Sequence, residues 1–134
     1  MTVVEFKSSD DGAILRFVDG GIQSEGERDF IIELDARDFF GRARSSTFEV
    51  QSPADYFQRL AQYPRGWDNE EVWEDLDHNV RLTATSDKLG HVTFEVVLHG
   101  SHQHLLRYAW TCELGTLEMM ARTLNELFGA RASS

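Results

Sequence analysis

The chain has 134 residues, of which 23 are acidic and 13 are lysine or arginine, so its formal net charge is -10. This length fits one domain around one hydrophobic core, and we expect a single globular domain over residues 1–130 with a frayed tail at 131–134. The negative charge repels phosphate backbones and anionic lipid headgroups, which excludes nucleic acid and membrane surfaces as favoured partners.

The sequence also bears on the compartment of the protein. No apolar run approaches the ~20 residues that cross a bilayer, and Met1 to Ser9 lacks the basic start and apolar core of a secretory signal. Cys112 is the only cysteine, so no internal disulfide can form, which is typical of a reducing compartment. We therefore expect a cytoplasmic protein.

Short strands are predicted in the first half of the chain. Apolar and polar residues alternate, with the period of a half-buried strand, in the segments 2–7, 13–18 and 30–34. A fourth strand is expected to end at 47–50. Asp10-Asp11-Gly12 separates the first two strands, and the Asp19-Gly20 step predicts a hairpin turn after the second.

A helix is predicted from Ser52 to about Tyr63. Ser52 is a good N-cap, Pro53 suits the first helical position, and Asp55 stands where a capping box places its acid. The helix is expected to stop before Pro64. One side of it is apolar and consists of Tyr56, Phe57, Leu60 and Ala61.

The last third of the chain has the clearest pattern. Period-two alternation predicts strands over 80–85 and 92–98, and Asp87-Lys88-Leu89-Gly90 supplies the short polar turn of an antiparallel hairpin. A third strand at 106–114 is expected to pair with 92–98. Gly129 is expected to end a final helix as a left-handed cap. The apolar residues at helical spacing in that helix are Leu117, Met120, Ala121, Leu124, Leu127 and Phe128.

These elements predict the class of fold. A helix with one apolar stripe must bury it, and the nearest apolar surface is the face of the sheet. We predict an α+β domain in which a meandering antiparallel sheet of about six or seven strands is covered by the Ser52 and Thr116 helices. An exposed sheet edge would permit dimerisation by strand addition, so a monomer and a homodimer are both compatible with the sequence.

Carboxylates are concentrated between Trp67 and Asn79, a segment without lysine or arginine. A negative surface attracts a basic partner, and tryptophans can anchor an interface. The spacing lacks the glycine and the terminal glutamate of a calcium loop. The alternative is a solvated connection whose two tryptophans cover the core. We predict a protein-binding site formed by Trp67, Asp68, Glu70, Glu71, Trp73, Glu74, Asp75 and Asp77.

Three histidines, His99, His102 and His104, lie around Gly100-Ser101 at the expected end of a hairpin. Imidazoles bind zinc, but a turn does not by itself aim three rings at one point, and no cysteine or acidic ligand stands in the run. We predict a polar loop with no metal and no other cofactor. A metal site made by these histidines is the alternative.

No catalytic residue is predicted. Cys112 lies on the strand face of Trp110 and Leu114, where a thiol is buried, poorly ionised and acts as a small apolar filler. The chain also lacks a nucleophile elbow, a phosphate loop, a dinucleotide fingerprint and a helical zinc-protease motif. A short basic run is interpreted as a source of weak surface ion pairs; its members are Arg37, Arg42 and Arg44.

Several landmarks stand in order along most of the chain. They are a strand-rich first third, the Ser52 helix, Gly66-Trp67, the acidic Trp73 segment, Asp87 to Gly90 with His91-Val92, Trp110, and Glu113-Leu114-Gly115 before the Leu117-Glu118 helix. In this order the chain resembles an uncharacterised family of small bacterial domains, some of which are suspected to be immunity proteins of toxin systems. Turns, caps and core aromatics bear on shared fold more than on shared activity. The resemblance implies a binding role in which a small acidic protein covers a partner, for example a basic nuclease-type toxin domain.

From the charge and the resemblance we predict a non-catalytic, acidic protein-binding module of immunity type that covers a basic toxin domain. The alternative is a small enzyme or ligand-binding domain with a pocket between the sheet and the helices, using His99, His102 and His104. Stoichiometric zinc that is lost when those histidines are replaced would favour the alternative.

Overall fold

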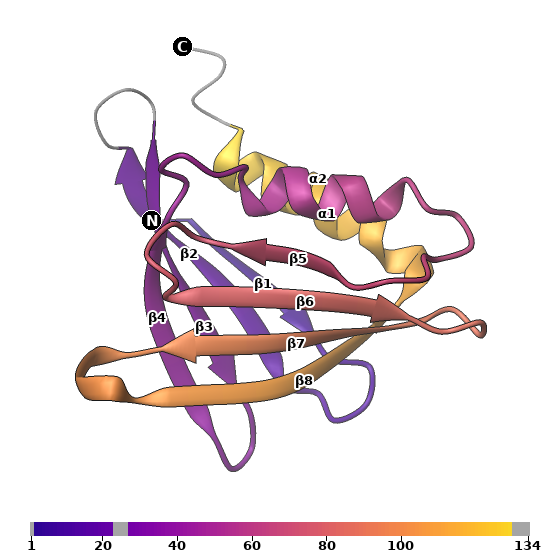
Figure 1. Ribbon diagram of the computed structural model, residues 1–134, viewed down its shortest axis with the longest axis horizontal. Coiled ribbons are helices and arrows are strands. Elements are labelled where there is room, and N and C mark those ends of the chain that lie inside the picture. Colours follow the sequence, from indigo (N-terminus) through magenta and orange to yellow (C-terminus); the bar gives the residue numbers. More distant parts are fainter. Residues whose placement is uncertain (1, 23–26, 130–134) are drawn as a thin grey trace.

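The computed structural model describes residues 2–22 and 27–129, which form eight strands and two α-helices (Figure 1). The tail expected at 131–134 lies outside the described residues. Within the described ranges, neither helix has the length and apolar character needed to span a membrane. In chain order the elements are β1 (Val3–Lys7), β2 (Ile14–Ile22), β3 (Arg28–Asp35), β4 (Phe40–Ser46), α1 (Pro53–Ala61), β5 (Glu71–Glu74), β6 (Val80–Ser86), β7 (His91–His99), the 3₁₀ turn η2 (Ser101–Gln103), β8 (Leu105–Glu113), the 3₁₀ turn η3 (Leu114–Thr116) and α2 (Leu117–Phe128).

The strands form two antiparallel sheets. β1 to β4 make one four-stranded meander and β5 to β8 make another, each with its strands in chain order. The antiparallel α+β class is confirmed, whereas the prediction of a single sheet is wrong. The reason is α1, which follows β4 and carries the chain away from the first sheet, so that β5 starts a new one. In Figure 1 the second sheet crosses in front of the first, and both helices lie on the β5 side.

The apolar faces of both sheets and both helices meet in one core. Phe57 of α1 stacks on Phe94 of β7 with ring centroids 5.0 Å apart, and Phe30 of β3 meets Phe128 of α2 edge-on at 4.9 Å. Phe17 of β2 makes edge contacts with Phe57 and Phe128. Such pairs add about 0.5–1.5 kcal/mol each beyond the burial of their area. By these contacts α1 packs on both sheets, and α2 packs on the first.

Both predicted helices are confirmed. The hydroxyl of Ser52 accepts a hydrogen bond from the backbone N–H of Asp55 at 3.1 Å, and Pro53 opens α1. All six residues of the predicted α2 stripe are buried. The expected left-handed cap at Gly129 is wrong, because its φ is -91°. A Cβ at this position would lie 2.7 Å from the carbonyl oxygen of Asn125, so a close backbone approach requires the glycine.

The fourth strand lies earlier than expected. β4 covers Phe40–Ser46, and residues 47–50 follow it. The residues of β4 on its inner face are Gly41, Ala43 and Ser45, of which Ala43 and Ser45 are buried. Because these side chains are small, the strand has no hydrophobic periodicity that the sequence could reveal.

β2 continues through the step at which a hairpin turn was expected. The pairing with β3 shifts register between Asp19 and Gly21, which is a β-bulge. Gly21 has a φ of +103°, a value that glycine adopts without strain. A Cβ at Gly20 would lie 2.8 Å from the carbonyl oxygen of Asp29. The two glycines therefore serve a bulge inside a strand, and the predicted turn is wrong.

The hairpins of the second half are confirmed. The turn 87–90 connects β6 to β7, and the backbone N–H of Asp87 donates to the carbonyl of His91 at 3.0 Å. β8 pairs with β7 as expected. β5 is an element that the sequence did not reveal: it lies inside the acidic segment and forms the edge of the second sheet beside β6.

Candidate functional site

The two tryptophans of the predicted acidic site are anchored in the fold. Trp73 on β5 is buried, and its indole N–H donates to the backbone carbonyl of Gln51 at 2.8 Å. Trp67 is half-buried and donates its indole N–H to the carbonyl of Ala84 at 3.1 Å. Trp73 is therefore inaccessible to a partner, while Trp67 keeps an exposed part.

Asp75 is a buried structural carboxylate. Its Oδ1 accepts the backbone N–H groups of Asn79 at 2.8 Å and Val80 at 3.2 Å, and its Oδ2 accepts the hydroxyl of Ser45 at 2.8 Å. Because Ser45 lies on β4 and Val80 begins β6, this side chain connects the two sheets. A buried carboxyl group is tolerated where hydrogen bonds within the protein replace those it would make to water.

The remaining carboxylates of the segment differ in their availability. Glu71 is half-buried and lies 3.3 Å from Nε of Arg59, and Glu74 lies 3.1 Å from Nδ1 of His78. The other three are exposed, and no ion pair among the described residues involves them. These are Asp68, Glu70 and Asp77. The surface predicted from eight residues is thus narrowed to three free carboxylates and part of Trp67, and its role as a binding site stays a prediction.

The three histidines lie at the end of the β7–β8 hairpin. His99 ends β7, His102 lies in η2 with a φ of +57°, and the rings of His102 and His104 are 6.3 Å apart. In the part of the chain that the structure describes, no group of three or more His, Cys, Asp or Glu residues is placed to hold a metal ion. Cys112 is buried as expected, and this burial raises the pKa of its thiol to about 12.

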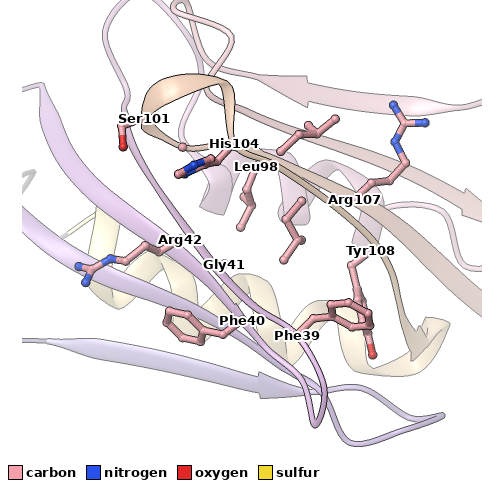
Figure 2. A pocket seen from close by; sticks show the side chains of 12 residues that line it. Phe39, Phe40, Gly41, Arg42, Leu98, Ser101, His104, Arg107 and Tyr108 are labelled. Atoms are coloured by element: carbon pink, nitrogen blue, oxygen red, sulfur yellow. The ribbon is translucent and has the colours of Figure 1, made fainter.

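An open cleft with a volume of about 780 Å³ lies between β4 and the first half of β8. We call it the β4–β8 cleft (Figure 2). It is bounded by the β3–β4 turn on one side and by the β7–β8 connection on the other. The residues that line it are Phe39, Phe40, Gly41, Arg42, Leu98, Gly100, Ser101, His104, Leu105, Leu106, Arg107 and Tyr108.

The cleft is mainly apolar, and its apolar side chains are unusually exposed. Phe39 is 65% exposed, and Phe40 and Leu105 are each 56% exposed. Leu98, which is buried, and Leu106, which is half-buried, add further apolar surface. Figure 2 shows the two phenylalanine rings on one side of the cleft, with Leu98 across from them. The cleft therefore offers side-chain surface that the protein itself leaves uncovered.

The polar groups of the cleft are cationic or neutral, and none of the described residues that line it is acidic. The side chain of Arg42 is 59% exposed, and its one ion pair with another described residue is long, 3.7 Å to Glu33. Arg107 is exposed and has no ion pair among the described residues. Its guanidinium extends away from the phenylalanine rings (Figure 2). The cleft lining thus contains two arginines and no acidic residue, although the chain as a whole has a net charge of -10.

Tyr108 closes one end of the cleft. Its hydroxyl donates a short hydrogen bond to the carboxylate of Asp11 in the β1–β2 turn. This bond raises the pKa of Tyr108 to about 12, because ionisation would remove the donated proton. The same bond and the backbone N–H of Ala13 hold the pKa of Asp11 below its ordinary value. The hydroxyl of Tyr108 is thus already bonded within the fold, whereas the exposed side chains of Phe39, Phe40 and Leu105 are not covered.

Sequence reasoning missed this cleft for identifiable reasons. Phe39 and Phe40 stand between predicted strands and belong to no apolar stripe, and Arg42 was interpreted as one of several surface charges. The sequence signal for the cleft was a pair of adjacent aromatic residues next to a basic run. These two residues belong to no strand or helix periodicity that would place them on a buried face. The alternative pocket was expected between sheet and helices, whereas the cleft lies between strands of the two sheets.

Nearly the whole described chain matches one family of proteins. The model of a family described as "Family of unknown function (DUF6228)" matches residues 6–129, from β1 to the residue after α2. The chain belongs to this family. No curated protein and no solved structure matches it. The DUF6228 match agrees with the resemblance to a family without known activity, while the immunity role and the bacterial origin stay predictions.

Proposed function

We propose that this chain is a non-catalytic protein-binding module whose partner docks in the β4–β8 cleft. The observation that carries the proposal is the joint exposure of Phe39, Phe40 and Leu105 around one open depression. Soluble domains seldom leave several large apolar side chains together in water, and such patches mark interaction sites. Leu98 and Leu106 extend the apolar surface into the cleft, where a partner side chain would lose contact with water.

The polar groups of the cleft suit recognition better than chemistry. Arg42 and Arg107 supply positive charge and hydrogen-bond donors, and a guanidinium group has no acceptor with which to act as a general base. Tyr108 has a raised pKa and its hydroxyl already serves Asp11, which disfavours a role as nucleophile or base. The thiol of Cys112 is buried and poorly ionised. These properties support binding without catalysis.

A second contact surface is proposed for the acidic segment. Asp68, Glu70 and Asp77 are exposed and unpaired among the described residues, so they are able to attract a basic protein. This is the contact that an immunity-type function requires, and its support is the charge of the segment together with the resemblance. Trp73 and Asp75 are left out of this surface, because both are buried.

Affinity capture with three immobilised proteins tests the proposal. They are the unmodified chain, a cleft variant with Phe40→Ser and Leu105→Ser, and a surface variant with Asp68→Lys, Glu70→Lys and Asp77→Lys. Circular dichroism should first show the same folded state for all three. We expect the native lysate to contain a protein retained by the unmodified chain and the surface variant but not by the cleft variant.

Two other results would contradict a partner site in the cleft. One is equal retention of the same protein by the cleft variant. The other is a basic protein that only the surface variant fails to retain and that moderate salt releases, which would assign binding to the acidic surface and support the immunity-type function.

A further inference from the structure

The β4–β8 cleft runs along the edge of the second sheet formed by β8, where backbone N–H and C=O groups of the described residues are free to bond. We infer that it binds an extended segment of a partner protein, which adds to the second sheet as one more strand along the first half of β8. The inference rests on the proposed function and goes beyond it, because it names the conformation and the side-chain pattern of the partner. Strand addition uses main-chain hydrogen bonds for affinity and alternate side-chain contacts for specificity.

The direction of the hydrogen-bonding groups on β8 follows from the hairpin that precedes it. The backbone N–H of Gly100 donates to the carbonyl of His104 at 2.8 Å, so this pair is hydrogen-bonded across the hairpin. In an antiparallel pair, bonded and non-bonded positions alternate. Leu105, Arg107 and Ala109 therefore direct their N–H and C=O groups away from β7, toward the outer edge of the sheet.

The far end of the same edge is already occupied. The backbone N–H and C=O of Thr111 point to the outer edge of the sheet, as those of Arg107 do. The carbonyl of Thr111 accepts the backbone N–H of Ser9 at 2.9 Å. Its own N–H donates to the hydroxyl of Ser8 at 3.2 Å. The β1–β2 turn thus completes the edge at this end. Among the described residues, no such partner exists for the outward groups of Leu105 and Arg107.

The first sheet provides a surface on which an added strand would lie. In Figure 1 the turn between β3 and β4 projects past the outer edge of β8. Phe39 and Phe40 stand at the end of that turn, at the entrance to β4. A Cβ at Gly41 would lie 2.6 Å from Cδ1 of Leu106, so the glycine lets β4 pass close to β8. A strand beside β8 would cover the two phenylalanine rings.

The walls of the cleft specify the side chains of the added strand. Its inward side chains would meet Leu106, Tyr108 and Phe40, so apolar residues fit there. The side chains of the added strand on the opposite face of the sheet would lie next to the side chain of Arg107. Opposite charges on neighbouring strands stabilise each other. An acidic residue fits this position, because the cleft lining contains no carboxylate of its own. The partner segment therefore alternates apolar residues with polar ones that include an acid.

A second copy of this chain fits the edge less well. If two β8 strands paired in the antiparallel register centred on Arg107, the two guanidinium groups would lie opposite each other, which is destabilising. Each chain would also bring a net charge of -10 to the contact. We therefore expect the occupant to be another protein.

A peptide library supplies the probe. The intact chain selects from random peptides of about nine residues, which is longer than the free first half of the β8 edge, and the Phe40→Ser, Leu105→Ser variant removes those that bind elsewhere. We expect the selected peptides to alternate apolar and polar residues and to carry aspartate or glutamate among the polar ones. One of them is then synthesised for measurement of its affinity.

Two measurements on this peptide report the backbone bonds. Methylation of single peptide nitrogens should weaken binding about tenfold or more at every second position and little at the positions between. Hydrogen exchange of the outward amides of Leu105, Arg107 and Ala109 should slow in the complex. The amides of Leu106 and Tyr108 already bond to β7, so they serve as the internal control.

The possible failures are distinguishable. If a peptide binds the cleft but shows no alternation in the methylation series and no slowing at the outward amides, strand addition is wrong while the cleft remains a binding site. If no selected peptide depends on Phe40 and Leu105, both the inference and the cleft-binding function are wrong. If sedimentation shows a dimer that the cleft variant loses and that excludes peptides, the occupant is a second copy.

The charge preference has its own test. Replacing the acid of the selected peptide by its amide should weaken binding severalfold at low salt, and Arg107→Gln should remove this difference. Arg65→Gln is the control, because Arg65 is exposed and lies outside the cleft lining. An equal affinity of the unmodified chain for the acid and amide peptides would contradict the acidic character of the partner.

Discussion

In two regions of this protein, the number of charged residues and the number of groups exposed to a partner differ in opposite directions. The segment from Trp67 to Asp77 is rich in carboxylates, yet Trp73 and Asp75 are buried and bonded, and two further acids have partners. The β4–β8 cleft has few charges, but its aromatic rings and its strand edge are uncovered. The difference shows that a high density of polar residues does not reveal which of them already have hydrogen-bond partners inside the fold.

The exposed rings of the cleft also have an energetic meaning. Full burial of a phenylalanine stabilises by about 1.5–3 kcal/mol relative to exposure, and the fold forgoes part of this at Phe39 and Phe40. A docking partner would recover it. The buried carboxylate of Asp75 is the reverse case, since its hydrogen bonds are satisfied and a partner has nothing to gain there.

The largest expected effect tests whether the acidic segment is part of the fold. Asp75→Ala removes an acceptor from Ser45, Asn79 and Val80, and we expect it to lower the free energy of unfolding by about 3 kcal/mol. Urea denaturation measures this. Asp77→Ala is the matched control and should stay within about 0.5 kcal/mol of the unmodified chain. Similar small effects for both would mean that Asp75 is not a structural residue.

The next effect concerns the two tryptophans. Trp73→Phe loses buried ring volume and the bond to Gln51, and we expect a loss of about 2 kcal/mol in the free energy of unfolding. Trp67→Phe loses a comparable bond to Ala84 but less burial, so its effect should be smaller. Thermal and urea unfolding compare them, and a larger effect at Trp67 would reverse their assigned roles.

The cleft should show a smaller effect on stability. Phe40→Ser and Leu105→Ser each remove a side chain that is more than half exposed, and we expect each to cost about 1 kcal/mol or less. Their loss of partner binding would then be a direct effect. A loss as large as that of Trp73→Phe in the same urea series would show that these side chains hold the fold.

The smallest expected effect on stability depends on pH and concerns the hydrogen bond between Tyr108, at one end of the cleft, and Asp11. Tyr108→Phe removes the donor to Asp11, so the pKa of Asp11 should rise toward its ordinary value, although the N–H of Ala13 remains. Because the folded-state pKa of Asp11 is lowered, this bond stabilises at neutral pH and the contribution is lost as pH falls through that lowered pKa. Carboxyl NMR titration reads the pKa, and unfolding at neutral and acidic pH reads the stability difference.

A result with Tyr108→Phe that leaves the pKa of Asp11 unchanged would contradict the bond. Tyr63→Phe is the control, since Tyr63 follows α1, whereas the hydroxyl that donates to Asp11 is that of Tyr108.

Much of the second half could be predicted because its signals are local. The period of two in β6, β7 and β8, the turn 87–90 and the stripe of α2 each lie within a few residues. β4 and β5 could not be predicted in the same way. The inner residues of β4 are small, and β5 is short and acidic, so the buried face of each is decided by the opposing layer.

The candidate site was less accessible to sequence reasoning than the fold. Arg42 and Arg107 are separated along the chain by α1 and three strands, and only the crossing of the sheets places both at one cleft. Exposure is likewise a property of the packed molecule: Phe39 and Phe57 are the same residue type, but one faces water and the other the core.

The sequence by itself determined the helices, the Ser52 cap, the hairpins of the second half and the acidic character of the chain, because these depend on neighbouring residues and on composition. The tertiary structure alone decided that there are two sheets, that Asp75 is buried and that the edge of β8 is open beside Phe40. These features depend on which distant segments meet, since burial and unpaired edges are set by packing between layers.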